Sequence, residues 1–276
     1  MSKAVIRIAA EDHPLALRRA ELLMDCVTEN GFEPRLLPVP VPADTSVFPV
    51  LGEVLRRGEA ELLLCRWEER PQTPDPDLPM AALSAREDPR DALILEGGDP
   101  FSGGVIGCSG ENRRLQLMEL FPGLEIISLE GDAFSQLRQL EQGRCGALVL
   151  SAADLKAMGL EKRICRIFSA EELLPSPGQG VWTVCCRQGT DLSCLRGYSS
   201  VDSCFVSLAE KAFMRPLKGR GVIWSRLLPD GETLLLRGAL CSGQAGVLKG
   251  SISGGKGKAE LLGRTLAANL MIRELR

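Results

Sequence analysis

One stretch constrains the fold of this chain more than any other: residues 104–137, GVIGCSGENRRLQLMELFPGLEIISLEGDAFSQL. Residues 105–107 form a short apolar run, and Ser109 follows within a turn-forming sequence. Residues 113–121 then place apolar side chains at helical spacing, and a second apolar run at 124–129 follows a Pro-Gly stop. The stretch therefore predicts the strand–turn–helix alternation of an open α/β sheet.

In such a sheet, the carboxyl end of a strand and the start of the next helix face a crevice. Free backbone N–H groups at the helix start favour an anion, and ligands of open α/β sheets bind at these ends. We therefore expect a functional site near Ser109, provided that the chain also supplies suitable charges.

The same alternation continues along the first two thirds of the chain and favours mainly parallel, wound sheets. Expected strands lie at 5–9, 35–39, 61–64, 147–150 and 181–186, with helices at 12–30, 50–57 and 151–158. A dense charge cluster at 86–93 and the stiff PSPGQG at 175–180 look like crossings between two domains. We expect the strand at 181–186 to return to the first domain.

The last part of the chain has a different order. A helix at 204–215 precedes strands at 221–227 and 233–240, joined by a Pro-Asp-Gly hairpin turn, and a helix at 258–275 ends the chain. The glycine- and lysine-rich segment 253–258 lacks phosphate-loop spacing, so we expect a flexible surface loop there. The predicted division is 1–86 with 178–196, then 87–177, then a small α+β domain at 197–276.

Composition excludes several classes of protein. The 276 residues are 45% hydrophobic and 25% charged, with a formal net charge of −3, which gives no basic signature for nucleic acid. No apolar run reaches membrane-spanning length, and the N-terminus does not read as a signal peptide, so we expect a cytoplasmic protein without nucleic-acid or membrane partners.

Ten cysteines and a single histidine provide no C-x-x-C pair, so we predict no metal site. Most of these cysteines lie among apolar residues, which is typical of small buried side chains in a reducing compartment.

Several motifs together resemble those of hydroxymethylbilane synthase, also called porphobilinogen deaminase, in the family's order and over nearly the whole chain. They are VIRIAAEDHPLAL at 5–17, REDPRDAL at 86–93, VIGCSGENRRLQL at 105–117, LEIISLEGD at 124–132, ADLKAMGLEKRI at 153–164 and PGQG at 177–180. The resemblance implies three domains, the first two like periplasmic binding proteins with the active cleft between them. It also implies a dipyrromethane cofactor on a cysteine of the third domain, which primes the joining of four porphobilinogen units.

That chemistry requires fixed cations for acetate and propionate groups, an aspartate near the pyrrole nitrogens and a thiolate for the cofactor. In the first motif, Glu11 and His13 stand where the family has arginine and serine. The family's H-S-M-K-D-V-P reads CRWEERP at 65–71, so Glu68 replaces the lysine and Glu69 the catalytic aspartate.

The later motifs also depart from the family. Asn112 replaces the first arginine of the T-S-S-L-R-R turn, while Arg113 is kept. Glu130 and Gln136 replace two further cleft arginines, and Gly221 stands at the position of the cofactor-bearing cysteine. The segment between residues 39 and 50 is also shorter than the family's mobile lid. We therefore expect no covalent dipyrromethane.

Few candidate site residues remain. Glu69 is the candidate catalytic carboxylate, and Ser109, Arg113 and His13 are candidates for substrate binding. His13 heads a helix, so it could serve as a general base or only as a cap. The alternative candidate thiols are Cys65, Cys108 and, in the last domain, Cys241.

Three functions stay open at this point. The chain is a catalytically impaired family member that binds a neutral or cationic small molecule or nothing, a divergent but active synthase, or a non-enzymatic partner subunit of another tetrapyrrole-pathway protein. We favour the first, because anchor, acid and several cations are lost together while the fold motifs survive.

Overall fold

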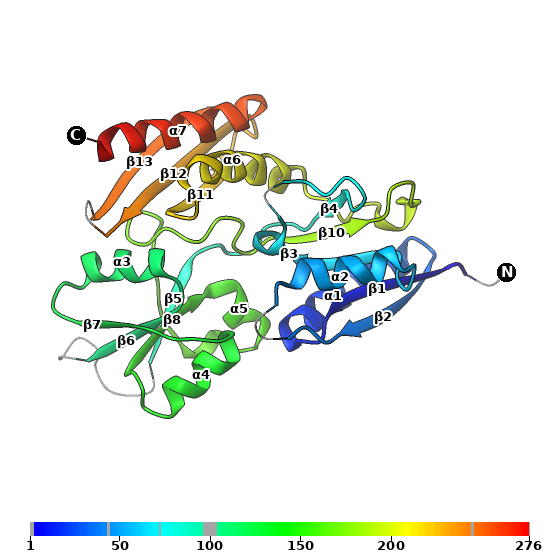
Figure 1. Cartoon of the computed structure of the whole chain (residues 1–276), viewed down its shortest axis with the longest axis horizontal. Helices are drawn as coiled ribbons and strands as arrows, with labels where there is room; N and C mark the ends of the chain where they lie inside the picture. Colours follow the sequence, from blue (N-terminus) through cyan, green and yellow to red (C-terminus); the bar gives the residue numbers. More distant parts are fainter. Residues whose placement is uncertain (1–2, 43–44, 72, 96–103, 244–245, 276) are drawn as a thin grey trace. The chain divides into compact units, whose positions relative to one another are not determined.

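The computed structural model describes residues 3–42, 45–71, 73–95, 104–243 and 246–275. They form two compact units, Met1–Glu87 with Gly180–Cys204, and Asp88–Gln179 with Phe205–Arg276 (Figure 1). The finer division into three domains stays a prediction. Among the described residues, no helix is both long and apolar enough to cross a bilayer.

The first unit contains a five-stranded sheet in the order β2-β1-β3-β10-β4. Its strands are β1 (Val5–Glu11), β2 (Glu33–Val39), β3 (Leu62–Arg66), β4 (Met80–Leu83) and β10 (Trp182–Cys186), and its helices are α1 (Pro14–Glu29) and α2 (Val47–Arg56). The strand β10 comes from the returning segment and pairs with β3 and β4.

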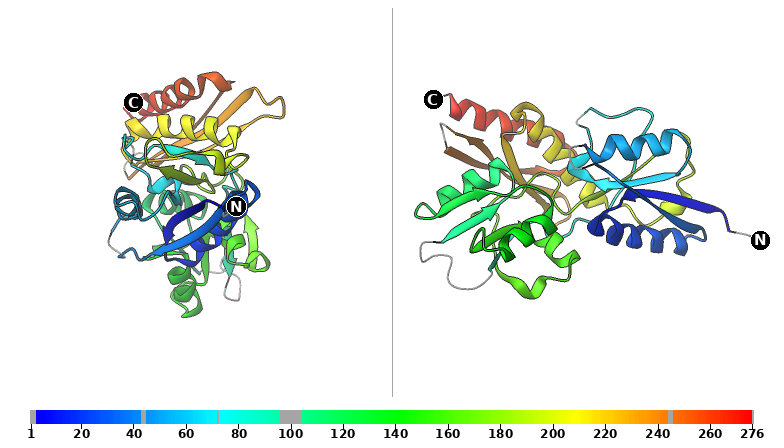
Figure 2. Two further views of the ribbon diagram at one scale, coloured as in Figure 1. Left: turned by 90° about the vertical axis from the view of Figure 1, so that its right-hand side faces the viewer. Right: turned by 60° about the horizontal axis from the view of Figure 1, so that its bottom comes forward.

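The two helices of this unit cover opposite faces of the sheet (Figure 2). Alternation along the strands explains this arrangement, because successive side chains of a strand point to opposite faces. Ile8 packs with the apolar face of α1, whereas its neighbour Ala9 packs with α2. The central strands are therefore apolar on both faces, which is typical of a covered sheet.

The second unit contains another five-stranded sheet, in the order β7-β6-β8-β5-β9. Its strands are β5 (Asp91–Leu95), β6 (Val105–Cys108), β7 (Glu125–Ser128), β8 (Ala147–Ser151) and β9 (Ile164–Ile167), and its helices are α3 (Glu111–Leu120), α4 (Ala133–Glu141) and α5 (Ala152–Ala157). The organising stretch thus forms β6, α3, β7 and α4, as its turn residues and apolar spacing predict.

The expectation of mainly parallel sheets is wrong. In each sheet two neighbouring pairs are parallel, but β10 runs antiparallel to β3 and β4, and β5 runs antiparallel to β8 and β9. These two strands enter their sheets from a crossing and not from a strand–helix–strand unit, so nothing forces them to run parallel.

The last part of the chain forms a three-stranded antiparallel sheet with helices on one face. Its elements are α6 (Val201–Leu217), β11 (Gly221–Leu227), β12 (Thr233–Ser242), β13 (Gly246–Gly255) and α7 (Ala259–Glu274). Along the described parts of the whole chain, short 3-10 turns lie at Trp67–Glu69, Glu161–Arg163, Ser193–Leu195 and Lys256–Lys258. The predicted fold class, two α/β domains followed by a small α+β domain, is confirmed.

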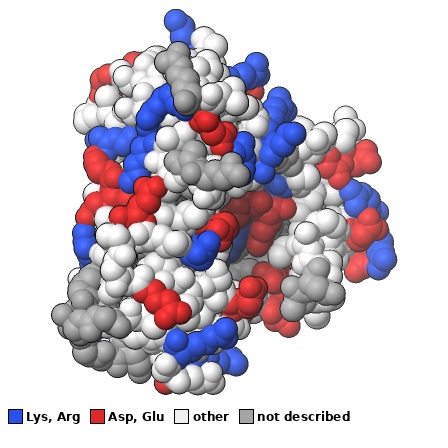
Figure 3. Space-filling model, turned by 60° about the vertical axis from the view of Figure 1, so that its left-hand side comes forward, with Lys and Arg blue, Asp and Glu red and all other residues white. Residues whose placement is uncertain are grey.

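One local expectation about this part is wrong. Residues 253–255 are not a surface loop but the end of β13, which pairs with β12 over its whole length, and residues 256–258 form a 3-10 turn leading into α7. Pairing with the apolar strand β12 outweighs the weak strand propensity of the glycines and serines. Figure 3 shows basic and acidic side chains interspersed over most of one face of the chain, in keeping with the many local ion pairs such as Arg114–Glu111.

Candidate functional site

Three carboxylates meet at the carboxyl ends of the strands of the first unit. Glu11 is the last residue of β1, and Glu68 and Glu69 form the 3-10 turn that follows β3. The backbone N–H of Arg66 donates a hydrogen bond of 2.8 Å to Oε2 of Glu69, which fixes this carboxyl against the strand end. Glu11 and Glu68 lie close enough to Glu69 to repel its negative charge.

Burial raises the pKa of Glu69 to about 7, mainly because the charged form loses water. The hydrogen bond from Arg66 and the charge of Arg66 pull the pKa down, and Glu68 and Glu11 push it up. A group with such a pKa exchanges a proton near neutral pH, which suits general acid or base chemistry. It does not suit the permanent negative charge that stabilises a cationic intermediate.

Arg66 provides positive charge beside these carboxylates, and its guanidinium is shared between a carboxylate and an aromatic ring. Its guanidinium lies 3.9 Å from Glu68 and also stacks over the ring of Trp182, 5.3 Å from the ring centroid. His13 occupies the N-cap position of α1, and its side chain makes no capping hydrogen bond to that helix. The side chain of His13 therefore does not cap α1 by a hydrogen bond, and its role as a general base stays a prediction.

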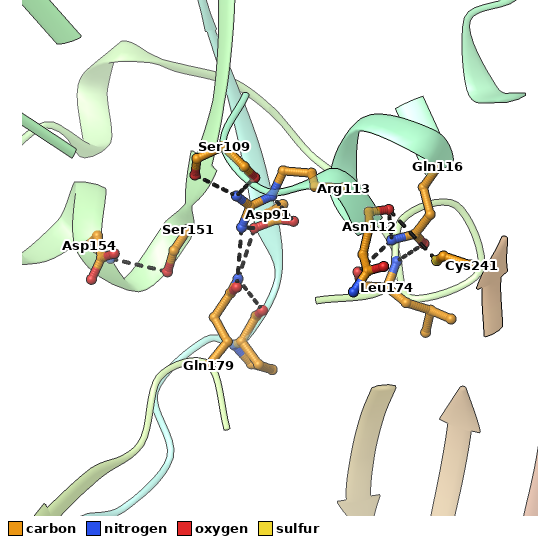
Figure 4. Close-up of polar contacts among 11 residues, drawn as sticks. Asp91, Ser109, Asn112, Arg113, Gln116, Ser151, Asp154, Leu174, Gln179 and Cys241 are labelled. Atoms are coloured by element: carbon orange, nitrogen blue, oxygen red, sulfur yellow. Dashed lines mark hydrogen bonds and ion pairs between the residues drawn. The ribbon is translucent and has the colours of Figure 1, made fainter. Parts of the chain in front are cut away.

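In the second unit, Arg113 at the start of α3 is tied into its own unit (Figure 4). Its Nε and Nη2 donate to the two carboxylate oxygens of Asp91, at 2.9 and 3.0 Å. Its Nη1 donates to the carbonyl and hydroxyl oxygens of Ser109, and Nη2 also reaches Oε1 of Gln179 at 3.4 Å. Each of the five guanidinium N–H groups therefore has an acceptor within the protein.

The pair is buried, since the side chains of Arg113 and Asp91 are only 12% and 1% exposed. Burial alone lowers the pKa of Arg113, but Asp91 raises it by more, so the guanidinium stays charged. The structure thus brings together two predicted residues, Ser109 and Arg113, and adds Asp91 and Gln179 to them.

Asn112, the residue before Arg113, contacts the segment that carries Gly221, the position predicted to correspond to the family's cofactor cysteine. Its side-chain amide donates to the carbonyl oxygens of Gly219, at 2.7 Å, and Gly221, at 3.2 Å. One turn later, Gln116 makes two hydrogen bonds with the backbone of Leu174. The face of α3 is thus fastened to its neighbours by neutral side chains.

Gly221 begins β11 and is buried. A Cβ atom at this position would lie 2.7 Å from Cδ1 of Leu217 and 2.9 Å from Sδ of Met214. Contacts this short do not occur for Cβ atoms, so any side chain here requires the ends of the Leu217 and Met214 side chains to move.

The candidate thiols are buried as well. Cys65 is 1% exposed and Cys108 is fully buried, and burial raises the pKa of both, to about 11 for Cys108. Cys241 lies beside Asn112, whose carbonyl oxygen accepts a weak hydrogen bond of 3.8 Å from Sγ, and burial raises the pKa of Cys241 to about 12. A thiol with a raised pKa is a poor nucleophile, because the reacting form is the thiolate.

The two other positions that are predicted to correspond to cleft arginines of the family, Glu130 and Gln136, have different surroundings. Glu130 is exposed, and its carbonyl oxygen accepts a hydrogen bond from Gln139. Gln136 is buried on α4, where Nε2 donates to the carbonyl oxygen of Gly131 at 2.7 Å. Neither position supplies a positive charge.

Sequence reasoning did not find Asp91 and Gln179 as partners of Arg113, although both lie in motifs that it singled out. The signal for Asp91 was present: a carboxylate at the start of the apolar run at 91–95 requires a cation when the strand is buried. No cluster of three metal-ligating side chains occurs among the residues that the structure describes.

Comparison with known proteins identifies relatives over the whole chain. Residues 6–193 match the family model described as porphobilinogen deaminase, dipyromethane cofactor binding domain. The porphobilinogen deaminase of Ruminiclostridium josui is 33% identical, with 96% of this chain and 97% of the relative covered. That of Syntrophotalea carbinolica is 30% identical, with 99% and 94% covered.

Solved structures with similar chain traces include the methionine-binding protein MetQ, at 13% identity and a TM-score of 0.49, over 75% of this chain and 94% of that one. The second substrate-binding domain of Lactococcus lactis GlnP has a TM-score of 0.43 at 12% identity, over 78% and 91%.

Proposed function

This chain belongs to the porphobilinogen deaminase family of tetrapyrrole biosynthesis, and we propose that it keeps the family's fold but has lost the family's reaction. In this proposal it does not join porphobilinogen units, and any ligand that it holds at the strand ends of the first unit is neutral or cationic. Packing at Gly221, the position of the family's cofactor cysteine, is the observation that carries the proposal.

The residues around Gly221 do not fit a thioether-linked dipyrromethane. The Cβ of a cysteine there would meet the buried side chain of Leu217 and the partly buried side chain of Met214, so the residue would compete with them for space. The amide of Asn112 is also hydrogen-bonded to the carbonyl oxygens of Gly219 and Gly221, so the loop is held by a neutral contact where the family has a cation. Both substitutions favour a closed, structural loop over a cofactor arm.

Cys241 does not replace the missing anchor in this proposal. It is 2% exposed, and the desolvation that raises its pKa to about 12 keeps the thiol protonated at neutral pH. Attack on an electrophilic pyrrole requires the thiolate. No other cysteine occurs between residues 205 and 276.

The charges left for the substrate also support loss of the reaction. Arg113 is neutralised by Asp91, and Glu11, Glu68 and Glu69 form an anionic group in the first unit. A pair of unit charges 4 Å apart interacts by roughly 4 kcal/mol at an effective dielectric near 20. Replacing cations by anions therefore opposes binding of porphobilinogen, which carries two carboxylates.

Three measurements on the purified full chain test the proposal, with the Ruminiclostridium josui relative treated identically as the positive control. We expect an intact mass equal to that of the polypeptide, no saturable heat on titration with porphobilinogen, and no uroporphyrin after oxidation of the products. A dipyrrole adduct on any cysteine, low-micromolar binding, or turnover within about tenfold of the median enzyme rate of roughly 10 s⁻¹ would restore the synthase function.

A restored cysteine provides a sharper version of the same test. We expect Gly221→Cys to destabilise the chain by about 1–3 kcal/mol through overpacking, and to gain no adduct when exposed to porphobilinogen. Gly257→Cys is the matched control, because a Cβ at Gly257 meets no atom within 4 Å. An adduct and activity in Gly221→Cys alone would show that the single cysteine is all that the chain lacks.

A further inference from the structure

The first unit contains a cavity whose lining includes none of Glu11, Glu68 and Glu69. It has a volume of about 370 Å³ and lies between α1, the segment 84–87, the start of β10 and the segment 196–198. Cavities of about 300–1,000 Å³ hold small ligands. We propose that this cavity binds a small aromatic molecule that carries one carboxylate.

Aromatic and aliphatic side chains form one part of the lining. Trp182 is 6% exposed, and its backbone is held on both sides by Ser84, through N–H to hydroxyl and N–H to carbonyl hydrogen bonds. Tyr198 contributes the second ring, and Leu22 of α1, which is 56% exposed, contributes an aliphatic edge. Two rings on a fixed backbone favour a planar apolar ligand group, because aromatic pairs gain from offset or edge-on contact beyond the area that they bury.

The charges of the lining favour one negative charge on the ligand. Arg19 and Glu87 form a two-pronged ion pair, Nη1 to Oε1 and Nη2 to Oε2, and so cancel each other. With Arg86 and Arg196 counted against Glu29, the formal charge of the lining residues is +1. A guanidinium binds a carboxylate through two parallel hydrogen bonds, which makes a carboxylate the best-matched anion.

Tyr198 adds a neutral donor. Burial raises the pKa of its phenol, and the nearby thiol of Cys26 raises it further, so the hydroxyl keeps its proton at neutral pH. A protonated phenol donates one hydrogen bond, which suits the second oxygen of a carboxylate. The lining thus combines ring contact, one net cation and one hydroxyl donor, and this combination distinguishes an aromatic carboxylate from an aromatic amine or from acetate.

The cavity also lies beside the segment at which the chain leaves the first unit. The segment 84–87 is the last part of the first unit before the chain continues into the second unit at Asp88. An occupant that contacts this segment and β10 would restrain both at once. The proposed ligand would therefore restrain the segment that connects the two units without touching the carboxylates at the strand ends.

The test is calorimetric titration of the full chain with phenylacetate, with phenethylamine, 2-phenylethanol and acetate as probes that change the charge or remove the ring. We expect saturable binding of phenylacetate with a Kd on the order of 1 mM or tighter, weaker binding of the alcohol, and none of the amine or of acetate. No saturation by phenylacetate up to about 10 mM, or an amine that binds as tightly, would overturn the proposal.

Two variants locate the binding. Arg196→Gln should weaken phenylacetate about fivefold or more and leave the alcohol unchanged, and Tyr198→Phe should weaken phenylacetate about two- to threefold. Arg18→Gln is the matched control, because Arg18 precedes cavity-lining Arg19 but is itself exposed and paired with Glu21. If Arg196→Gln and Arg18→Gln give the same affinity while both keep the parent melting temperature, the ligand lies elsewhere and the proposal fails. The result is independent of porphobilinogen binding, so the two proposals can fail separately.

Discussion

Arg113 in the second unit and Glu69 in the first unit each follow the carboxyl end of a strand, and both are largely buried, but their surroundings differ. Arg113, at a position where the family residue is kept, is opposed by the buried carboxylate of Asp91 and has an acceptor for every N–H group. Glu69, at a changed position, receives a hydrogen bond from the backbone of Arg66 and has Glu11 and Glu68 as like-charged neighbours.

This difference shows how the partner of a buried charge decides its ionisation. A buried charge that keeps its partner remains ionised and fixed, and it becomes part of the structure. A buried carboxylate without an adequate counter-charge shifts its pKa toward neutrality instead. Arg113 is thus held as part of the structure by its partner, whereas Glu69 can exchange a proton near neutral pH.

The largest expected effect is on the compensated pair. Asp91→Ala leaves the guanidinium of Arg113 buried without its counter-charge, so we expect a loss of about 3–5 kcal/mol in the free energy of unfolding. Chemical denaturation followed by circular dichroism measures it. The matched control is Asp88→Ala, which removes the half-exposed pair with Arg90 and should cost about 0–1 kcal/mol. Equal effects of the two variants would mean that burial of Arg113 does not depend on Asp91.

A somewhat smaller effect should appear as a pH dependence. The pKa of Glu69 is about 7 in the folded chain against an ordinary value of 4.5, so the folded state holds this proton more tightly than the unfolded state. Stability should therefore fall as the pH rises from about 4.5 to about 7, by roughly 2–3 kcal/mol, and stay level above that.

The variant Glu69→Gln tests this directly. It should remove that part of the pH dependence, be more stable than the parent chain at pH 8 and match it near pH 4. Chemical denaturation across the pH range provides the measurement, and Glu59→Gln, at an exposed position of the same unit, is the control. If Glu69→Gln keeps the slope of the parent chain between pH 4.5 and 7, the carboxyl of Glu69 is solvated and the comparison with Arg113 does not hold.

The smallest expected effect is at Asn112, whose side-chain amide is already hydrogen-bonded to two backbone carbonyl oxygens. Asn112→Ala removes two hydrogen bonds to the carbonyl oxygens of Gly219 and Gly221, so we expect a loss of about 1 kcal/mol. Asn269→Ala, at an exposed position of α7, is the matched control and should change little. A loss equal to that of the control would mean that Asn112 does not hold the loop, and that support for a closed cofactor position would be withdrawn.

Local sequence patterns determined much of the fold. Pro14 at the first turn and Gly31 after the last predicted a helix that the structure places at Pro14–Glu29, and Pro-Asp-Gly at 229–231 predicted the turn between β11 and β12. These features depend on the conformational preferences of a few adjacent residues, so they can be read without a fold. The strands β4 and β9 were not predicted, because short strands carry too few residues for a clear period.

By itself, then, the sequence determined most of the element order and the family, and it predicted which site positions are changed. Only the tertiary structure decided that Arg113 pairs with Asp91, 22 residues away, that Asn112 reaches Gly219, 107 residues away, and that a side chain at Gly221 would displace those of Leu217 and Met214. It also decided the antiparallel direction of β5 and β10 and the burial that moves the pKa of Glu69. The physical reason is that desolvation, packing space and the partners of a buried charge are properties of distant segments brought together, which no local pattern contains.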